Sequence, residues 1–282
     1  MTTARGFDLD RYLDRVGYSG PRNATRGTLE TLHRLHPAAI PFENLNPLLG
    51  WQVALDADAL QTKLVAGGRG GWCFEHNILF RHALEALGFS VTSLAARVLW
   101  NAAPGSPVGP RSHMLLLVEI DGSPHLADVG FGGNVLTAPL RLEPHTAQPT
   151  PHEPHRLKPL DNGYANGYVL EAFFGGEWRA FYRFTLEPQF PADYEVSNWY
   201  LCHHPSSFFR QMLIAARATP EGRYSLRDNT FAIHRGDETE RRSLGDPAAL
   251  RACLENDFGI RLPESPKLEA MLERVSLTPA PG

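Results

Sequence analysis

The chain has 282 residues, of which 43% are hydrophobic and 21% charged, so we expect a globular protein with a sizeable core rather than a disordered chain. Its formal net charge is −4 and no cluster of Lys and Arg forms a basic stripe, which argues against a nucleic-acid partner. No segment has the roughly 18 consecutive apolar residues of a membrane span, and residues 1–17 lack the apolar stretch of a secretory signal, so we expect a cytoplasmic protein without a membrane partner.

Residues 1–88 have the pattern of a helical unit. Hydrophobic periodicity and capping signals predict helices over residues 8–16, 28–36, 56–64 and 73–87. Pro37 is expected to end the second of them, and Gly88 the last. A glycine-rich break at residues 67–71 separates the third helix from the fourth.

The period changes to that of strands between residues 89 and 200. Strands are predicted over residues 91–100, 113–120, 125–131, 168–174 and 178–185. Asp121-Gly122 is a two-residue hairpin signal between the second and third strands, and Gly175-Gly176 joins the last two. Residues 143–163, rich in Pro, His and Asn, are expected to form a long surface loop.

The last part, residues 201–282, mixes the two patterns. Short helices are expected over 198–201 and 207–216, strands over 224–226, 230–234 and 239–244, and a helix from 246 to 257. The whole order is helices, then an antiparallel β unit, then a small α/β unit, which predicts an α+β fold. A doubly wound nucleotide-binding fold would need regularly alternating strands and helices.

The cysteines are few: Cys73, Cys202 and Cys253 form no CxxC pair and no metal-ligand spacing, which fits a reducing compartment. Histidines stand at helical spacing (His33 and His36) and in the Pro-rich stretch (His145, His152 and His155). Because no acidic or thiolate ligands accompany these histidines at ligand spacing, we predict no metal site. Cys202 and Cys253 are expected to be buried.

The sequence Arg-Gly-Gly-Trp-Cys-Phe-Glu-His-Asn, residues 69–77, is the most informative stretch. Its glycines let the backbone turn sharply into a helix, which places Cys73 at the helix N-terminus. Free N–H groups and the helix dipole there favour a thiolate nucleophile and can hold an oxyanion during acyl transfer. The alternative is a small buried apolar cysteine after a flexible loop.

His113 and Asp128 lie in neighbouring strands. If Asp121-Gly122 is a two-residue turn, Leu115 lies opposite Asp128 and His113 opposite Gly130. The two side chains then share a face as diagonal neighbours, roughly 7–8 Å apart at Cα, within reach of a hydrogen bond. Asp128 has apolar neighbours and needs a partner, which His113 can supply. A lone strand histidine is otherwise an exposed or hydrogen-bonded surface residue.

These motifs resemble the arylamine N-acetyltransferases. The resemblance rests on RGGWCFEHN, on RSH before an apolar strand, on ADVGFGG, and on further motifs at 41–44, 97–100, 197–200 and 204–207. It implies a Cys-His-Asp triad at Cys73, His113 and Asp128. It also implies a helical bundle (1–88), a β-barrel (89–200) and an α/β lid (201–282) around a cysteine-protease-like core. The implied reaction is a ping-pong transfer of acetyl from acetyl-CoA, a cosubstrate rather than a tightly bound cofactor, to an arylamine, hydrazine or N-hydroxyarylamine.

The resemblance also suggests roles around the triad. A glycine turn near the CoA pyrophosphate would comprise Gly130, Gly132 and Gly133, and the CoA arm would contact Trp100 and Ser112. The acceptor pocket would be lined by Phe42, Val98, Phe131 and Phe209. An ion pair between Glu43 and Arg69 would support the nucleophile. Each has a plainer alternative: an ordinary strand exit, hydrophobic core or a surface ion pair.

Three other functions remain open at this point. A thiol hydrolase or a transglutaminase-like enzyme uses the same triad order but needs an open peptide groove. An amide synthase of the same family closes a macrocycle on an aromatic amine without CoA. A non-enzymatic binding module would not need Cys73, His113 and Asp128 together.

Overall fold

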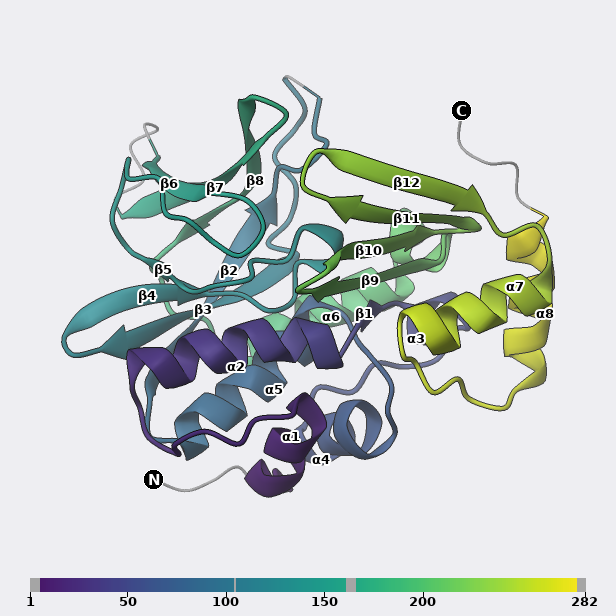
Figure 1. The fold of residues 1–282 in the computed structure, drawn as a ribbon, viewed down its shortest axis with the longest axis horizontal. Coiled ribbons are helices and arrows are strands. Elements are labelled where there is room, and N and C mark those ends of the chain that lie inside the picture. The colour runs from purple at the N-terminus through teal and green to yellow at the C-terminus, as the bar shows by residue number, and fades with distance from the viewer. Residues whose placement is uncertain (1–5, 104, 161–165, 278–282) are drawn as a thin grey trace.

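The computed structural model describes residues 6–103, 105–160 and 166–277. Figure 1 shows three parts: N-terminal helices, a curled seven-stranded sheet, and a five-stranded sheet with its own helices. The predicted α+β fold is confirmed. The division of the chain at residues 88 and 200 stays a prediction. No helix in the described ranges is long and apolar enough to cross a membrane.

The first part consists of short helices and a two-residue strand: α1 (Leu9–Val16), α2 (Arg26–Ala39), β1 (Phe42–Glu43), α3 (Leu45–Leu48), α4 (Ala57–Leu60), the π-helix η1 (Gln61–Ala66) and α5 (Cys73–Ala86). Side chains of Asp8, Thr25 and Asp56 cap α1, α2 and α4. The expectation that Pro37 ends α2 is wrong. Pro37 lies in the last turn, where its missing N–H costs one bond, and the N–H of Ile40 still donates to His36 O at 2.8 Å.

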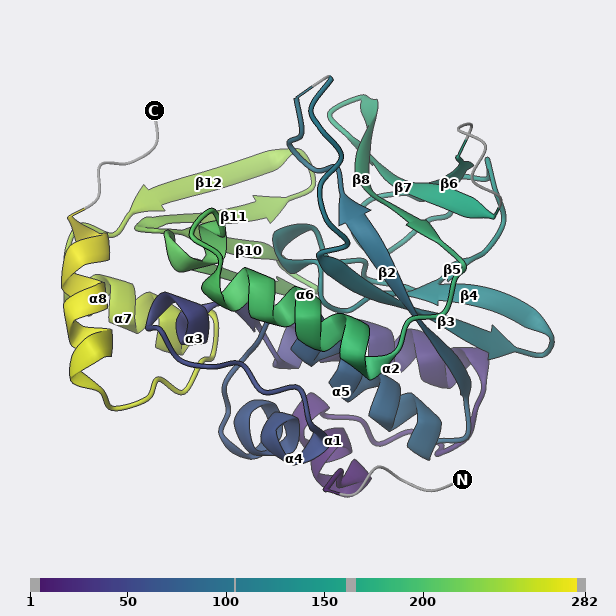
Figure 2. The same cartoon turned by 180° about the vertical axis from the view of Figure 1, so that it is seen from behind.

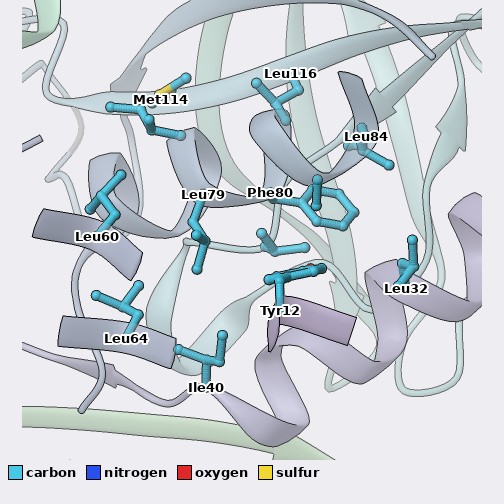
Figure 3. Packing of buried hydrophobic residues seen from close by; sticks show 14 of the residues in the cluster. Tyr12, Leu32, Ile40, Leu60, Leu64, Leu79, Phe80, Leu84, Met114 and Leu116 are labelled. Atoms are coloured by element: carbon cyan, nitrogen blue, oxygen red, sulfur yellow. The ribbon is translucent and has the colours of Figure 1, made fainter. Parts of the chain in front are cut away.

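Helix α5, which carries Cys73, is packed between other elements. Figure 3 shows Tyr12 of α1 and Leu32 of α2 beside Phe80 of α5, with Leu116 of β3 on the far side. All four side chains have no exposed surface. Burial of a large apolar side chain stabilises a fold by about 1.5–3 kcal/mol. The helix that positions the nucleophile is therefore held by the main core.

The seven-stranded antiparallel sheet runs in the order β5 (Leu140–Arg141), β4 (Ser123–Ala127), β3 (His113–Ile120), β2 (Ser90–Val98), β8 (Glu177–Thr185), β7 (Gly167–Phe174) and β6 (His155–Pro159). Bridges from Pro144 to Leu157 and from Gln148 to His155 join the chain after β5 to β6, so the sheet nearly closes into the expected barrel. Residues 143–160 are therefore not simply a surface loop, since they contain β6 and the buried Glu153, while residues 161–163 of the predicted loop lie outside the described residues.

The hairpin between β3 and β4 has the predicted register, with Ile120 opposite Ser123 and Leu116 opposite Ala127. Strand β4 nevertheless ends at Ala127, whereas the pattern predicted a strand to residue 131. The N–H of Asp128 donates to His33 Nε2 at 3.0 Å instead of to the sheet. The chain therefore leaves the sheet at Asp128 and turns toward α5.

The second sheet has the order β1, β9 (Ile214–Thr219), β10 (Gly222–Arg227), β11 (Thr230–Arg235) and β12 (Glu238–Ser243). It is covered by α7 (Pro247–Ala252), the π-helix η4 (Cys253–Asp257) and α8 (Pro266–Ser276). Helix α6 (Pro191–His203) crosses the face seen in Figure 2, and Tyr194 on it donates to Leu94 O of β2 at 3.0 Å.

The helix predicted over 207–216 is wrong. This segment forms only the short 3₁₀ turn η3 (Phe208–Arg210) before β9 begins. The side chain of Asn44 explains the difference: its amide donates to the carbonyls of Phe209 and Met212 at 2.8 Å, and its oxygen accepts from Ile214 N at 2.8 Å. This contact, 170 residues away in sequence, replaces the hydrogen bonds that a helix would make.

Candidate active site

Cys73 is the first residue of α5 and is only 5% exposed. The preceding loop is fastened to β1, because Glu43 N donates to Gly71 O at 2.8 Å and Gly71 N donates to Pro41 O at 3.3 Å. A Cβ on Gly70 would lie 2.0 Å from Pro41 O, so only glycine fits there. The Cys73 thiol, 3.6 Å from Ser112 O, therefore sits at a helix N-terminus beside the start of β3.

Two buried carboxylates, those of Glu75 and Glu43, stabilise this loop. Glu75 accepts from Trp72 N at 3.1 Å and from Lys63 Nζ at 2.7 Å, and burial raises the pKa of Glu75. The predicted Glu43–Arg69 pair is present at 2.6 Å and is buried, so the surface-pair alternative is wrong. Burial would raise the pKa of Glu43, but the cations of Arg69 and Lys63, together with the hydrogen bond from Leu45 N, outweigh burial and lower that pKa.

His113, the first residue of β3, lies next to Cys73. Its Nε2 donates to Asp128 Oδ2 at 2.7 Å, which leaves Nδ1 for the cysteine. Burial disfavours the imidazolium, yet the charge and hydrogen bond of Asp128, together with the neighbouring Cys73, raise the pKa of His113 to about 10. The shared face predicted for His113 and Asp128 thus becomes a direct contact, and the surface-histidine alternative is wrong.

Asp128 is fully buried and accepts four hydrogen bonds. Oδ2 accepts hydrogen bonds from His113 Nε2 and, at 3.0 Å, from the hydroxyl of Tyr182. Oδ1 accepts from Asn77 Nδ2 and from Gly130 N, both at 3.0 Å. Burial opposes the charge of Asp128, but His113 and the hydrogen bonds from Asn77 and Gly130 together outweigh burial and lower the pKa of Asp128. The carboxylate is therefore anionic and fixed in rotation.

Two of these partners had no role in the sequence interpretation. Asn77 lies four residues after Cys73, on the same face of α5, so helical spacing within the RGGWCFEHN motif was a usable signal. Tyr182 comes from β8, 54 residues from Asp128, and nothing local points to it.

A chain of hydrogen bonds between neutral side chains runs from Tyr12 through His36 and His76 to the backbone at Pro41. Pro41 O can only accept, so His76 Nε2 donates to it at 3.1 Å. His76 Nδ1 must then accept from His36 Nε2 at 2.9 Å, and His36 Nδ1 from the Tyr12 hydroxyl at 2.9 Å. Burial lowers the pKa of His76 to about 4 and that of His36 well below 6.5. Every proton in this chain of hydrogen bonds has one allowed position.

We predict that the folded protein loses stability as the pH falls from 6.5 toward 4. Burial lowers the pKa of His33 and His76 to about 4, so the unfolded chain binds protons in this window that the folded chain refuses. Each such histidine removes about 1.4 kcal/mol of unfolding free energy per pH unit. The contribution of His113 has the opposite sign: it is complete below pH 6.5 and is lost as the pH rises through about 10. Stability should therefore peak near neutral pH.

Urea unfolding between pH 7 and 4.5 measures this dependence. His76→Gln is the matched control, because a glutamine amide can donate to Pro41 and accept from His36 without titrating. The unfolding free energy of His76→Gln should change less steeply with pH than that of the wild type, because one fewer proton is taken up on unfolding. A wild-type unfolding free energy that stays constant from pH 7 to pH 5 would contradict the assignment.

Of the predicted acceptor-pocket residues, one contacts the triad directly. Phe131 packs edge-on against His113, with ring centroids 4.9 Å apart, while Phe42 and Phe209 contact each other at 6.2 Å. Val98, 38% exposed, is opposite the buried Tyr182 in the β2–β8 ladder and so shares its face. Their role in binding an acceptor stays a prediction.

The predicted CoA residues make different contacts in the structure. A Cβ on Gly130 would lie 2.8 Å from Cys73 Cα, so this glycine permits close packing, and its N–H is already engaged by Asp128. Gly132 and Gly133 open the 3₁₀ turn η2 (Gly132–Asn134), with Gly132 at φ +71°. Ser112 meets Cys73 through its carbonyl, whereas Trp100 packs on Phe181 at 5.2 Å.

The surroundings of Cys202 and Cys253 do not favour a thiolate. Cys202 and Cys253 are buried as predicted, and burial raises the pKa of their thiols to about 11 and about 12. Within the described ranges, no three His, Cys, Asp or Glu side chains lie together as a metal site would require.

Comparison with known proteins agrees with this geometry. A family model described as N-acetyltransferase matches residues 26–266. The arylamine N-acetyltransferase of Mycobacterium tuberculosis (strain ATCC 25618 / H37Rv) is 42% identical over 272 residues, which cover 95% of both chains. The chain belongs to the arylamine N-acetyltransferase family. The resemblance noted in the sequence is thereby confirmed, and the protein is an acyltransferase by family.

Two further members of the family are informative. A Salmonella typhimurium relative named arylamine N-acetyltransferase / N-hydroxyarylamine O-acetyltransferase is 41% identical over 254 residues, 89% of this chain and 88% of its own. The solved structure of the Mycobacterium marinum arylamine N-acetyltransferase in complex with CoA superposes with a TM-score of 0.90 at 42% identity, covering 95% of this chain and 99% of that one. The family fold therefore extends over nearly the whole chain.

Proposed function

We propose that this N-acetyltransferase moves an acetyl group from acetyl-CoA to an arylamine, a hydrazine or an N-hydroxyarylamine through a thioester on Cys73. The observation that carries the proposal is the buried His113–Asp128 pair beside a cysteine at a helix N-terminus. The names of the relatives, and the CoA bound to the Mycobacterium marinum enzyme, support the choice of donor and acceptor.

In the first half-reaction the Cys73 thiolate attacks the thioester carbonyl of acetyl-CoA. The oxyanion that forms is stabilised by N–H groups at the start of α5. When the tetrahedral intermediate collapses, the C–S bond to CoA breaks, and the His113 imidazolium can donate its proton to the leaving thiolate. Asp128 keeps the imidazole in one orientation throughout, as the third member of a triad does.

In the second half-reaction an amine attacks the Cys73 thioester. His113, now neutral, takes a proton from the attacking nitrogen, the thioester bond breaks, and the Cys73 thiolate and the imidazolium are restored. We propose that Phe42, Val98, Phe131 and Phe209 hold the acceptor ring, and that Trp100, Ser112, Gly130, Gly132 and Gly133 hold CoA. The three buried free cysteines support a cytoplasmic location, and we propose no nucleic-acid or membrane partner.

Intact-protein mass spectrometry after incubation with acetyl-CoA alone tests the proposal. We expect a gain of one acetyl group, located on Cys73 by peptide mapping and discharged when an arylamine such as aniline is added. Cys73→Ala is the control and should gain nothing. Acetylation at another residue, or a Cys73 thioester that water removes as fast as the amine does, would contradict the transferase assignment.

A further inference from the structure

The Pro- and His-rich stretch after β5 meets the second sheet at a buried ion pair. Arg223 of β10 is 4% exposed and Glu153 is 7% exposed. The guanidinium binds the carboxylate through two nitrogens: Nε donates to Glu153 Oε2 at 3.2 Å and Nη2 to Oε1. A charge pair of this kind is strongly oriented, because the planar fork of arginine matches a carboxylate.

The same guanidinium reaches the glycine turn. Its remaining terminal nitrogen, Nη1, donates to Val135 O at 2.8 Å and to Gly133 O at 3.3 Å. Arg223 therefore joins three segments that are distant in sequence: β10, residues around Glu153, and the turn η2. All three guanidinium nitrogens donate hydrogen bonds within the protein, so any effect of Arg223 on a ligand must come from the position it gives to the turn.

His152 joins this stretch to the second sheet, and His155 holds the backbone at Glu153. His155 Nδ1 bonds with the carbonyl of Glu153 at 2.9 Å, and His152 Nε2 with Thr219 O of β9 at 3.1 Å. Both acceptors are carbonyls, so each ring nitrogen donates. The stretch is thus docked on the β9–β10 hairpin, with the Glu153 carboxylate pointed at Arg223.

We propose that Arg223, held in place by Glu153, is a positioning residue for the acyl donor: it fixes η2 so that the N–H groups of this turn receive the pyrophosphate of acetyl-CoA. The proposal rests on the function proposed above and adds a residue pair to it. Binding Gly133 O within η2 and Val135 O directly after it orients two peptide planes at this turn, and a turn with aligned N–H groups binds anionic oxygens. Phe42 limits the turn on its other side, since a Cβ on Gly132 would lie 3.6 Å from that ring.

Two acetyl donors separate positioning from general stability. Acetyl-CoA carries the pyrophosphate, whereas p-nitrophenyl acetate carries the same acetyl group without it. Arg223→Lys keeps the charge, but one ammonium cannot bind two carbonyls and a carboxylate in the same geometry. In single-turnover acetylation of Cys73, we expect the second-order rate constant for acetyl-CoA to fall about tenfold or more, mainly through weaker binding of acetyl-CoA, and the rate with p-nitrophenyl acetate to stay within about twofold.

Arg217→Lys is the matched control. Arg217 lies on the neighbouring strand β9 and also binds carbonyls, Ala38 O at 2.6 Å and Asp257 O at 3.3 Å, but none in η2. Arg217→Lys should leave the ratio of the acetylation rates with acetyl-CoA and p-nitrophenyl acetate unchanged. Glu153→Gln, which keeps Arg223 but weakens its hold, serves as a second variant if Arg223→Lys folds poorly, and should show a smaller loss confined to acetyl-CoA.

Equal losses with both donors, or no loss with either, would overturn this inference and leave the proposed function intact. A wild-type protein that p-nitrophenyl acetate acetylates and acetyl-CoA does not would overturn the proposed function and the inference together. A loss confined to acetyl-CoA in both variants, with an unchanged Arg217→Lys ratio, supports it.

Discussion

Cys73→Ala is expected to lower acetyl transfer by a factor on the order of 10⁴ or more, to the level without enzyme, while the protein stays folded. The thiolate is the only group at the start of α5 that can form the acyl intermediate, and His113 cannot replace it. Cys73→Ser should be nearly as inactive, because a serine hydroxyl is a far weaker nucleophile than a thiolate at neutral pH. The measurement is arylamine acetylation at saturating acetyl-CoA, with thermal unfolding as the check on folding.

The two other cysteines are matched controls for this change. Cys202 and Cys253 are as buried as Cys73, at 5% and 2% exposed, and burial raises the pKa of their thiols. Among the described residues, neither thiol has a histidine partner. Cys202→Ala and Cys253→Ala should retain activity. Substantial transfer by Cys73→Ala, or an inactive but folded Cys202→Ala, would sink the assignment of the nucleophile.

Asp128→Asn is expected to slow acetylation of Cys73 by a factor on the order of 10²–10⁴. Both carboxylate oxygens accept two donors: His113 and Tyr182 on one, Asn77 and Gly130 on the other. An asparagine amide must turn its NH₂ toward one of these pairs, whichever way it is placed. Either the imidazole loses its acceptor or Oδ1 loses its role as acceptor for α5 and the turn.

The same substitution should also destabilise the fold. Breaking a buried charge pair by neutralising one member costs about 3–5 kcal/mol, because the other charge stays buried. The decisive measurement is the single-turnover acetylation rate of protein shown to be folded by its thermal transition. Asp121→Asn is the control: Asp121 is exposed in the β3–β4 turn at φ +50°, a conformation that asparagine tolerates. A rate for Asp128→Asn within a few-fold of wild type would show that this carboxylate is structural.

Local patterns in the sequence determined the elements that carry the triad. Helical periodicity after a glycine break placed Cys73 at the start of α5, and the two-residue turn at Asp121-Gly122 set the register of β3 against β4. His113 and Asp128 are only 15 residues apart, and Asp128 follows directly after β4, so the hairpin register alone brings it close to His113. These features depend on neighbouring residues, whose spacing the sequence shows directly.

Only the tertiary structure decided which distant groups complete the site. Tyr182 reaches Asp128 across 54 residues, and Glu153 reaches Arg223 across 70. Asn44 likewise turns a predicted helix into the η3 turn and strand β9. In each case a buried polar group must find a partner wherever the fold supplies one, because leaving it unpaired costs more than any local preference returns. Sequence spacing carries no record of such pairings, so the triad could be predicted, whereas partners as distant in sequence as Tyr182 could not.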